Sequence, residues 1–257
     1  MSEDVAKRAG RGAASPTRVR LGFLYPPTGA EHELYLAGEA LDPRVSVAVV
    51  GVRISGGDDE HASHHLRATA AIANLALSAR VLAHLRPASV MWACTSGSFI
   101  DGLAFARTQA AALSEIAGAP ASSTSLAFVS ALQCLGIGKV AVLATYPETT
   151  SQAFAEFLSE AGVTIDRLDW LDAPSGPAAA AFAKERFLDG ASRLGVPAGG
   201  ALLLPDTAVP SLDLVGPLEA QLGCPVLTAN QVTVWEAARL AGIRGPGPGR
   251  LFTEGTT

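Results

Sequence analysis

Short runs of aliphatic and β-branched residues alternate along this chain with longer alanine-rich segments of helical periodicity. This alternation is typical of βαβ units, in which each strand joins a parallel sheet and each helix covers one of its faces. The nearly continuous apolar character of the short runs indicates strands that are covered on both faces. We therefore predict an α/β fold with parallel sheets. The expected strands are Val19–Tyr25, Val45–Val52, Ser89–Ala93, Lys139–Thr145, Val163–Trp170, Ala201–Leu204 and Pro225–Ala229.

Glycines mark the ends of several of the intervening helical segments, as expected where a helix stops at a left-handed residue. The expected helices are Asp59–Leu85, Phe99–Ala117, Thr124–Leu135, Thr149–Ala161, Pro177–Leu194, Leu212–Leu222 and Gln231–Leu240.

The chain also resembles itself. A Tyr-Pro pair follows a strand twice, at Tyr25 and at Tyr146, and each half then contains a later strand that ends in a polar loop. We predict two similar α/β halves that face each other about a pseudo-twofold axis. The predicted parts are a disordered tail (1–17), a first half (18–122, completed by 228–257) and a second half (123–227).

In this arrangement the two polar loops lie at equivalent strand ends. The first begins at Cys94 and the second at Asp206. Ligands of open α/β sheets bind outside the carboxyl ends of the strands. We therefore expect Cys94 and Asp206 to face one another across a ligand-binding cleft.

Length and charge limit the classes of partner. The 257 residues carry 19 basic and 24 acidic side chains, a net charge of -5, which provides no basic field for nucleic acid or an anionic membrane. The longest weakly polar stretch, Ala68–Leu85, is interrupted by polar residues, so no membrane span is expected.

The three cysteines lack C-x-x-C spacing, which predicts neither a disulfide framework nor a zinc knuckle and favours a reducing cytoplasm.

Cys94 is the strongest candidate for chemistry. It follows an apolar strand and precedes Thr95-Ser96-Gly97-Ser98, small residues that can open a helix. A helix N-terminus offers unpaired N–H donors and partial positive charge, which bind carboxylates and act on a nearby thiol. The alternative is that Cys94 is a small buried apolar residue. We favour a functional Cys94, and a purely structural role for Cys134 and Cys224.

Asp206 and Tyr146 are further candidates at strand ends. Asp206 follows Leu202–Leu204 and is either the N-cap of the next helix or the partner of Cys94 across the cleft. The phenol of Tyr146 can donate a hydrogen bond to an enolate oxygen, or it is an ordinary tyrosine at a strand rim. The turn Pro26–Gly29 follows the first strand and can line the same cleft, although turn formation alone explains it.

A histidine-rich segment, Asp58–His65, raises the question of a metal. His61 and His65 are spaced i, i+4, as in some helical metal sites. Acidic residues at a helix start are ordinary, however, and a closed ligand set is not evident. We therefore predict no metal site here.

Five segments spread over Val19 to Phe252 make the chain resemble a known family. It is similar to the cofactor-independent aspartate/glutamate racemase superfamily, and within it to the group that contains arylmalonate decarboxylase and maleate cis-trans isomerase. The segments are Gly22–Pro27, Cys94–Phe99, Leu143–Tyr146, Leu202–Asp213 and Pro248–Phe252.

The resemblance implies two pseudosymmetric α/β halves with the site between them, and a small carboxylate or dicarboxylate substrate. It implies neither metal nor organic cofactor, and it leaves a homo-oligomer open. It also implies that Thr95, Ser96 and Tyr146, with N–H groups near Asp206 and Thr207, hold the oxygens of an enediolate. Pro26 is expected to line the substrate site.

The chain departs from the family at one strand end. Racemases and maleate isomerases of this group have cysteine at both positions, and arylmalonate decarboxylase has glycine at the position of Cys94 and cysteine at that of Asp206. A single cysteine suits decarboxylation followed by protonation, or isomerisation through a thiolate, better than two-base racemisation. We predict a decarboxylase of a substituted malonate; the alternatives are a maleate isomerase-like enzyme with Cys94 as nucleophile, and a small-carboxylate binding protein without turnover.

Overall fold

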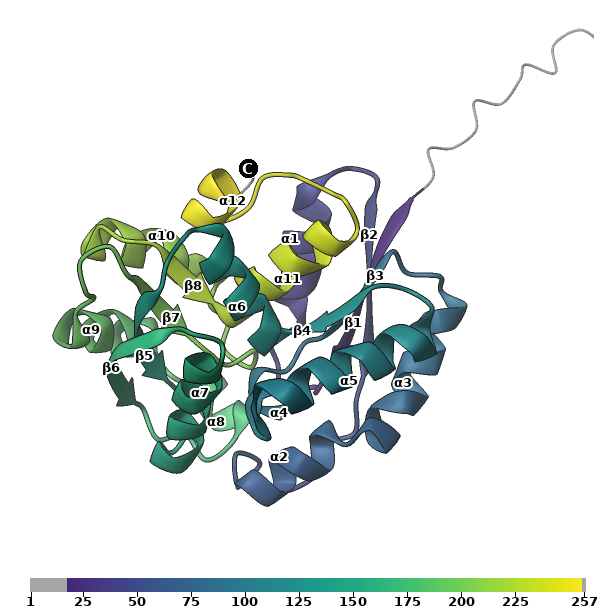
Figure 1. Ribbon diagram of the computed structural model, residues 1–257, viewed down its shortest axis with the longest axis horizontal. Helices are drawn as coiled ribbons and strands as arrows, with labels where there is room; N and C mark the ends of the chain where they lie inside the picture. Colours follow the sequence, from purple (N-terminus) through teal and green to yellow (C-terminus); the bar gives the residue numbers. More distant parts are fainter. Residues whose placement is uncertain (1–17, 256–257) are drawn as a thin grey trace, which may run out of the picture.

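The computed structural model describes residues 18–255, so the predicted disordered tail at 1–17 lies outside the described residues. Two four-stranded parallel sheets form the framework (Figure 1). The first has the order β2-β1-β3-β4 and the second β6-β5-β7-β8. The strands are β1 (Val19–Tyr25), β2 (Val45–Gly51), β3 (Ser89–Trp92), β4 (Ala121–Ser123), β5 (Lys139–Ala144), β6 (Thr164–Trp170), β7 (Ala201–Leu204) and β8 (Val226–Thr228).

The two sheets share one strand order, which confirms the α/β class and agrees with the internal similarity of the sequence. In this correspondence β1 matches β5 and β3 matches β7. Cys94, after β3, and Asp206, after β7, therefore occupy equivalent places. The central strands β3 and β7 are buried along their whole length, as expected for strands covered on both faces.

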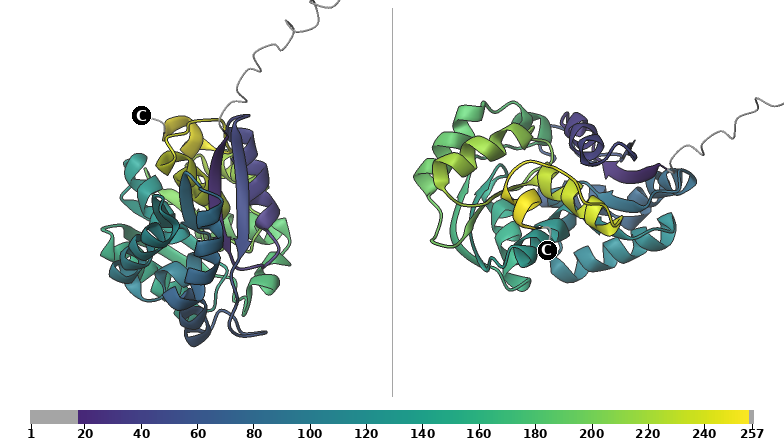
Figure 2. Two further views of the ribbon diagram at one scale, coloured as in Figure 1. Left: turned by 90° about the vertical axis from the view of Figure 1, so that its right-hand side faces the viewer. Right: turned by 90° about the horizontal axis from the view of Figure 1, so that it is seen from above.

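Helices cover both sheets and lie between them (Figure 2). The helices are α1 (Glu31–Leu41), α2 (Ser63–Ala70), α3 (Ile72–His84), α4 (Thr95–Phe99), α5 (Gly102–Ala117), α6 (Thr124–Cys134), α7 (Glu148–Glu160), α8 (Gly176–Ala180), α9 (Lys184–Leu194), α10 (Leu212–Leu222), α11 (Ala229–Leu240) and α12 (Arg250–Glu254). The largest apolar cluster contains residues of both sheets together with α6 and α11. Helix α11 follows β8 in sequence and contacts α1 and β3; the proposed division into halves at 122/123 stays a prediction.

The expected helix at Asp59–Leu85 is wrong in its continuity. It is broken at Ala71, whose backbone is extended between α2 and α3. The break is stabilised because side chains satisfy the last carbonyls of α2: Asn74 donates to Thr69 O and Gln109 donates to Ala70 O, each at 2.8 Å. Residues 59–62, predicted to be helical, instead form a loop at the site described below.

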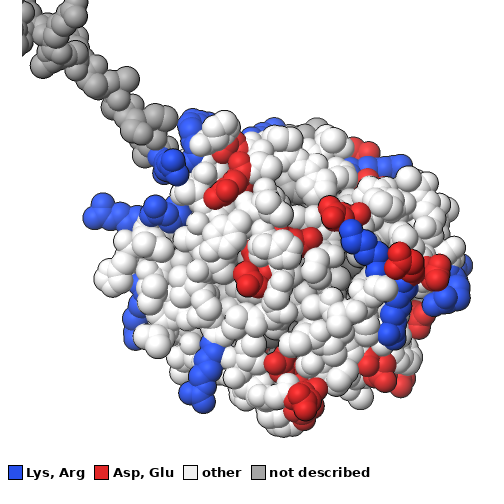
Figure 3. All heavy atoms as spheres, turned by 180° about the vertical axis from the view of Figure 1, so that it is seen from behind, with Lys and Arg blue, Asp and Glu red and all other residues white. Residues whose placement is uncertain are grey.

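Other differences concern short elements. The expected helix Pro177–Leu194 is divided into α8 and α9, and four elements were not predicted: α1, α4, β4 and α12. Within residues 18–255 no single helix is long and apolar enough to cross a membrane. The bent pair of α2 and α3 reaches the required length and apolarity only when the two helices are taken as one segment. The face in Figure 3 carries acidic and basic side chains scattered over a mainly uncharged surface.

Candidate active site

Five of the seven predicted site residues line one cavity between the sheets, and the other two, Thr95 and Tyr146, are not part of its lining. Its lining includes Pro26, Cys94, Ser96, Asp206 and Thr207, and its empty volume is about 380 Å³, including the part open to solvent. A larger cavity, about 850 Å³, lies elsewhere against α6, α11 and α12, and none of the predicted site residues lines it.

Cys94 is the N-cap of α4. Its Sγ accepts a hydrogen bond from Gly97 N at 3.4 Å and lies 3.8 Å from Ser96 Oγ. The residue is only 6% exposed. Burial raises the pKa of the Cys94 thiol to about 12, and the two hydrogen bonds lower it only in part. Burial therefore favours the protonated thiol over the thiolate at neutral pH.

Asp206 is buried in the facing loop, and it is not the N-cap of α10, because that helix begins after Ser211. Its Oδ2 accepts from Thr145 Oγ1 at 2.6 Å and its Oδ1 from Ala208 N at 2.9 Å. Burial raises the pKa of the Asp206 carboxyl, while His61 and the hydrogen bonds from Thr145 and Ala208 lower it. The backbone φ of Asp206 is +115°, a strained value for a residue other than glycine and a feature of many functional sites.

The loops of Cys94 and Asp206 are joined directly. Asp206 N donates to Thr95 Oγ1 at 3.3 Å. Among the N–H groups near Asp206 and Thr207, that of Asp206 is therefore engaged within the protein. The bond leaves the Thr95 hydroxyl proton available, because the oxygen is the acceptor here.

Tyr146 lies next to these loops. It is fully buried, and its hydroxyl has no hydrogen-bond partner within residues 18–255. Burial raises the pKa of the phenol well above its usual range, Asp206 and Cys94 raise it further, and the neighbouring hydroxyls of Thr95 and Ser96 lower it in part. A buried phenol without an acceptor is costly unless a ligand or water oxygen supplies one. Tyr146 lies beside the cavity and is not among the residues that line it.

The Tyr-Pro turn after β1 supports the opposite wall. The Tyr25 hydroxyl donates to Thr207 O at 3.1 Å, accepts from Ala30 N at 3.1 Å and lies 3.0 Å from Thr28 Oγ1. Thr28 itself lines the cavity, as expected for this turn. The Tyr25 contact with Thr207 connects the end of β1 to the loop after β7.

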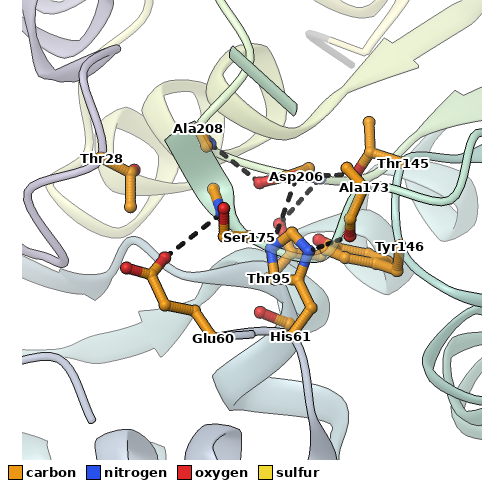
Figure 4. A network of polar contacts seen from close by, with 12 residues as sticks. Thr28, Glu60, His61, Thr95, Thr145, Tyr146, Ala173, Ser175, Asp206 and Ala208 are labelled. Atoms are coloured by element: carbon orange, nitrogen blue, oxygen red, sulfur yellow. Dashed lines mark hydrogen bonds and ion pairs between the residues drawn. The ribbon is translucent and has the colours of Figure 1, made fainter. Parts of the chain in front are cut away.

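Two site residues were missed by the sequence analysis. Glu60 and His61, in the loop between β2 and α2, both line the cavity. Glu60 Oε2 accepts from Gly176 N at 3.2 Å, and His61 Nε2 lies 3.9 Å from Asp206 Oδ2 (Figure 4). His61 stood in the sequence as one of three clustered histidines, and the local pattern gave no signal that distinguished it from the other two.

The histidine-rich segment is therefore divided. His61 points into the cavity, whereas Asp59, His64 and His65 bring ligand atoms within 4.8 Å of one another at a more exposed place. His65 Nε2 already lies 3.4 Å from Asp59 Oδ1. His61 is not part of this group, so the i, i+4 pair of His61 and His65 is not formed.

Comparisons with known proteins agree with this architecture. A sequence model described as arylmalonate decarboxylase matches residues 62–252. An arylmalonate decarboxylase from Bordetella bronchiseptica is 31% identical over 165 residues, which span 62% of this chain and 69% of that protein.

Solved structures give a similar result. A variant of arylmalonate decarboxylase with one glycine replaced by cysteine and one cysteine by serine, in its liganded form, has a TM-score of 0.75 at 26% identity and covers 92% of this chain and 99% of its own. A maleate isomerase from Pseudomonas putida S16, solved with maleate, has a TM-score of 0.83 at 20% identity over 92% and 98% of the two chains. The second likeness is one of fold.

Proposed function

The chain belongs to the arylmalonate decarboxylase family, and on that premise we propose that it decarboxylates a substituted malonate, with the Cys94 thiol as proton donor. The observation that carries the proposal is the position of Cys94. Its sulfur lines the cavity between the sheets and remains protonated, next to hydroxyl groups that can hold an oxyanion.

The reaction balances without a cofactor. The bond between C2 and one carboxylate breaks, and carbon dioxide leaves. The electron pair of that bond moves into the remaining carboxylate as an enediolate. The S–H bond of Cys94 then breaks, its proton goes to C2, and the thiolate is reprotonated from water. A thiol acid with a pKa of about 12 suits so basic an intermediate, since proton transfer to carbon is downhill.

Three hydroxyl groups are suited to hold the enediolate. Tyr146 has no other partner within residues 18–255, Thr95 retains a free proton, and Ser96 lies beside the sulfur. Each preorganised donor of this kind is worth roughly 3 kcal/mol toward a charged transition state. Ile54 and Leu66 provide an apolar wall for the substituent of the malonate.

The test is a carbon dioxide release assay with phenylmalonate and methylmalonate. We expect turnover by the wild type, a loss of at least 100-fold in Cys94→Ala, and wild-type rates in the matched control Cys134→Ala. Equal rates in wild type and Cys94→Ala reject the role of Cys94. Consumption of maleate without gas release supports the isomerase instead, and binding of phenylmalonate without product supports a binding protein.

A further inference from the structure

His61 belongs to the loop before α2 but is held by the segment that follows β6 and by α7. Its backbone N–H donates to Pro174 O at 3.0 Å, and its carbonyl accepts from Thr150 Oγ1 at 2.9 Å. Its Nδ1 lies 2.8 Å from Ala173 O. The imidazole is thus fixed by contacts more than 80 residues away in sequence, and the side chain is only 5% exposed.

These contacts decide where the proton of the ring lies. A carbonyl oxygen only accepts hydrogen bonds, so Nδ1 carries a proton and donates it to Ala173 O. The other nitrogen, Nε2, faces Asp206 Oδ2 at 3.9 Å (Figure 4). If His61 were neutral and Asp206 ionised, a nitrogen lone pair would face a carboxylate in a buried site. One additional proton, on either partner, removes this repulsion.

Within the described part of the chain, His61 is the one basic side chain that lines the cavity. Lys and Arg are absent from its lining within residues 18–255. The titratable groups around the pair are Glu60, Cys94, Tyr146 and Tyr25, and each is neutral or negative. When Asp206 is ionised and His61 is neutral, the pair carries a negative charge. An anionic substrate that enters the cavity is repelled by this charge, so its binding makes the unprotonated state of the pair more costly.

We propose that His61 and Asp206 form a buried pair that can share one proton, and that binding of a dicarboxylate is coupled to uptake of this proton by the pair. His61 is a positioning residue. With one shared proton the pair has no net charge, and the carboxyl group of Asp206 can therefore occupy a strand end that faces a dianion. The inference rests on the proposed function for the identity of the dianion.

The binding test uses calorimetry with phenylmalonate at pH 8 in two buffers of different ionisation enthalpy. We expect proton uptake by the wild type. His61→Gln leaves Asp206 without its partner, and we expect binding to weaken by about tenfold or more. Asp206→Asn removes the need for the proton, so uptake disappears. The amide that replaces the Asp206 carboxyl carries no charge. We therefore expect the double variant, His61→Gln with Asp206→Asn, to bind phenylmalonate within about threefold of the wild type.

Thr150→Val is the matched control for the position of the loop. It removes the bond to the His61 carbonyl and leaves the imidazole unchanged, so proton uptake persists. If His61 only anchors the loop, adding Asp206→Asn to His61→Gln gives no recovery. That result, or uptake that is the same in wild type and Asp206→Asn, overturns the proposal.

A ligand-free arm separates this inference from the proposed function. Nitrogen-15 NMR of His61 and carbon-13 NMR of Asp206 follow the two groups with pH. One shared step, lost in Asp206→Asn, supports the pair even if phenylmalonate does not bind. Two independent steps, or a His61 step that is unchanged in Asp206→Asn, overturn it.

Discussion

The backbone N–H of Asp206 donates to the hydroxyl of Thr95 at 3.3 Å, and this bond joins the loops that follow the central strands of the two sheets. Both residues are buried, at 5% and 1% exposure. The bond holds the loop of Cys94 against the loop of Asp206.

Replacement of Thr95 tests this bond. Thr95→Val removes the hydroxyl and leaves the Asp206 N–H buried without an acceptor, a loss of about 1–3 kcal/mol. Thr95→Ser retains the hydroxyl and is the matched control. We expect urea unfolding to show a lower free energy of unfolding for Thr95→Val and a value near the wild type for Thr95→Ser. Equal values for the two variants contradict the structural role of the bond.

Alkylation tests the protonation state of Cys94. With a pKa of about 12, on the order of one thiol in 10,000 is ionised at pH 8, and only the thiolate reacts with iodoacetamide. We therefore expect Cys94 to be the slowest of the three cysteines in mass-spectrometric labelling, with a rate that still rises between pH 8 and pH 10. Fastest labelling at Cys94 at pH 8 would instead indicate a thiolate and favour the isomerase.

Gly176 lines the cavity at a position with no room for a side chain. A Cβ atom at this position would lie 2.7 Å from Thr28 Cγ2 and 3.3 Å from Ala208 Cβ, and all three residues line the cavity. Gly176→Ala should therefore reduce kcat/KM by at least tenfold, with a cost in stability of about 1–3 kcal/mol from overpacking. Gly138→Ala, where a Cβ meets open space, is the control and should leave both quantities unchanged.

Glu33 predicts a pH dependence of stability. Its carboxylate accepts from Ser211 N, Leu212 N and Asn230 Nδ2, and burial nevertheless raises its pKa above the usual 4.5. A raised folded pKa contributes stability that is complete below pH 4.5 and is lost as the pH rises through the folded value. The free energy of unfolding of the wild type relative to Glu33→Gln should therefore fall as the pH rises above 4.5.

Urea unfolding across that range measures the difference. Glu39→Gln, on the exposed side of the same helix, α1, is the matched control for the loss of one carboxylate. A difference between wild type and Glu33→Gln that grows with pH would mean that the three hydrogen bonds outweigh the burial of the charge.

The strand ends were predictable because their signals are local. Short apolar runs specify buried parallel strands, and the polar residues directly after them must lie at one edge of the sheet. This reasoning placed Cys94, Ser96, Asp206 and Thr207 at one cavity without knowledge of the tertiary structure.

Helix α1 was not predicted, because its apolar pattern is interrupted. Its buried positions follow helical spacing, but one of them is the charged Glu33, which breaks the apolar stripe. A buried carboxylate is tolerated only because backbone and amide donors from α10 and α11 surround it, and these lie about 180 residues further along the chain.

The sequence alone determined the alternation of strands and helices, the two similar halves and the thiol and carboxyl that end equivalent strands, because each depends on neighbouring residues. The tertiary structure decided that His61 leaves the other histidines and joins Asp206, and that Thr95 bonds to the facing loop. The residues in each contact are separated by about 110 or more positions in the sequence. These contacts therefore form, and stabilise the site, only after the two sheets have packed together.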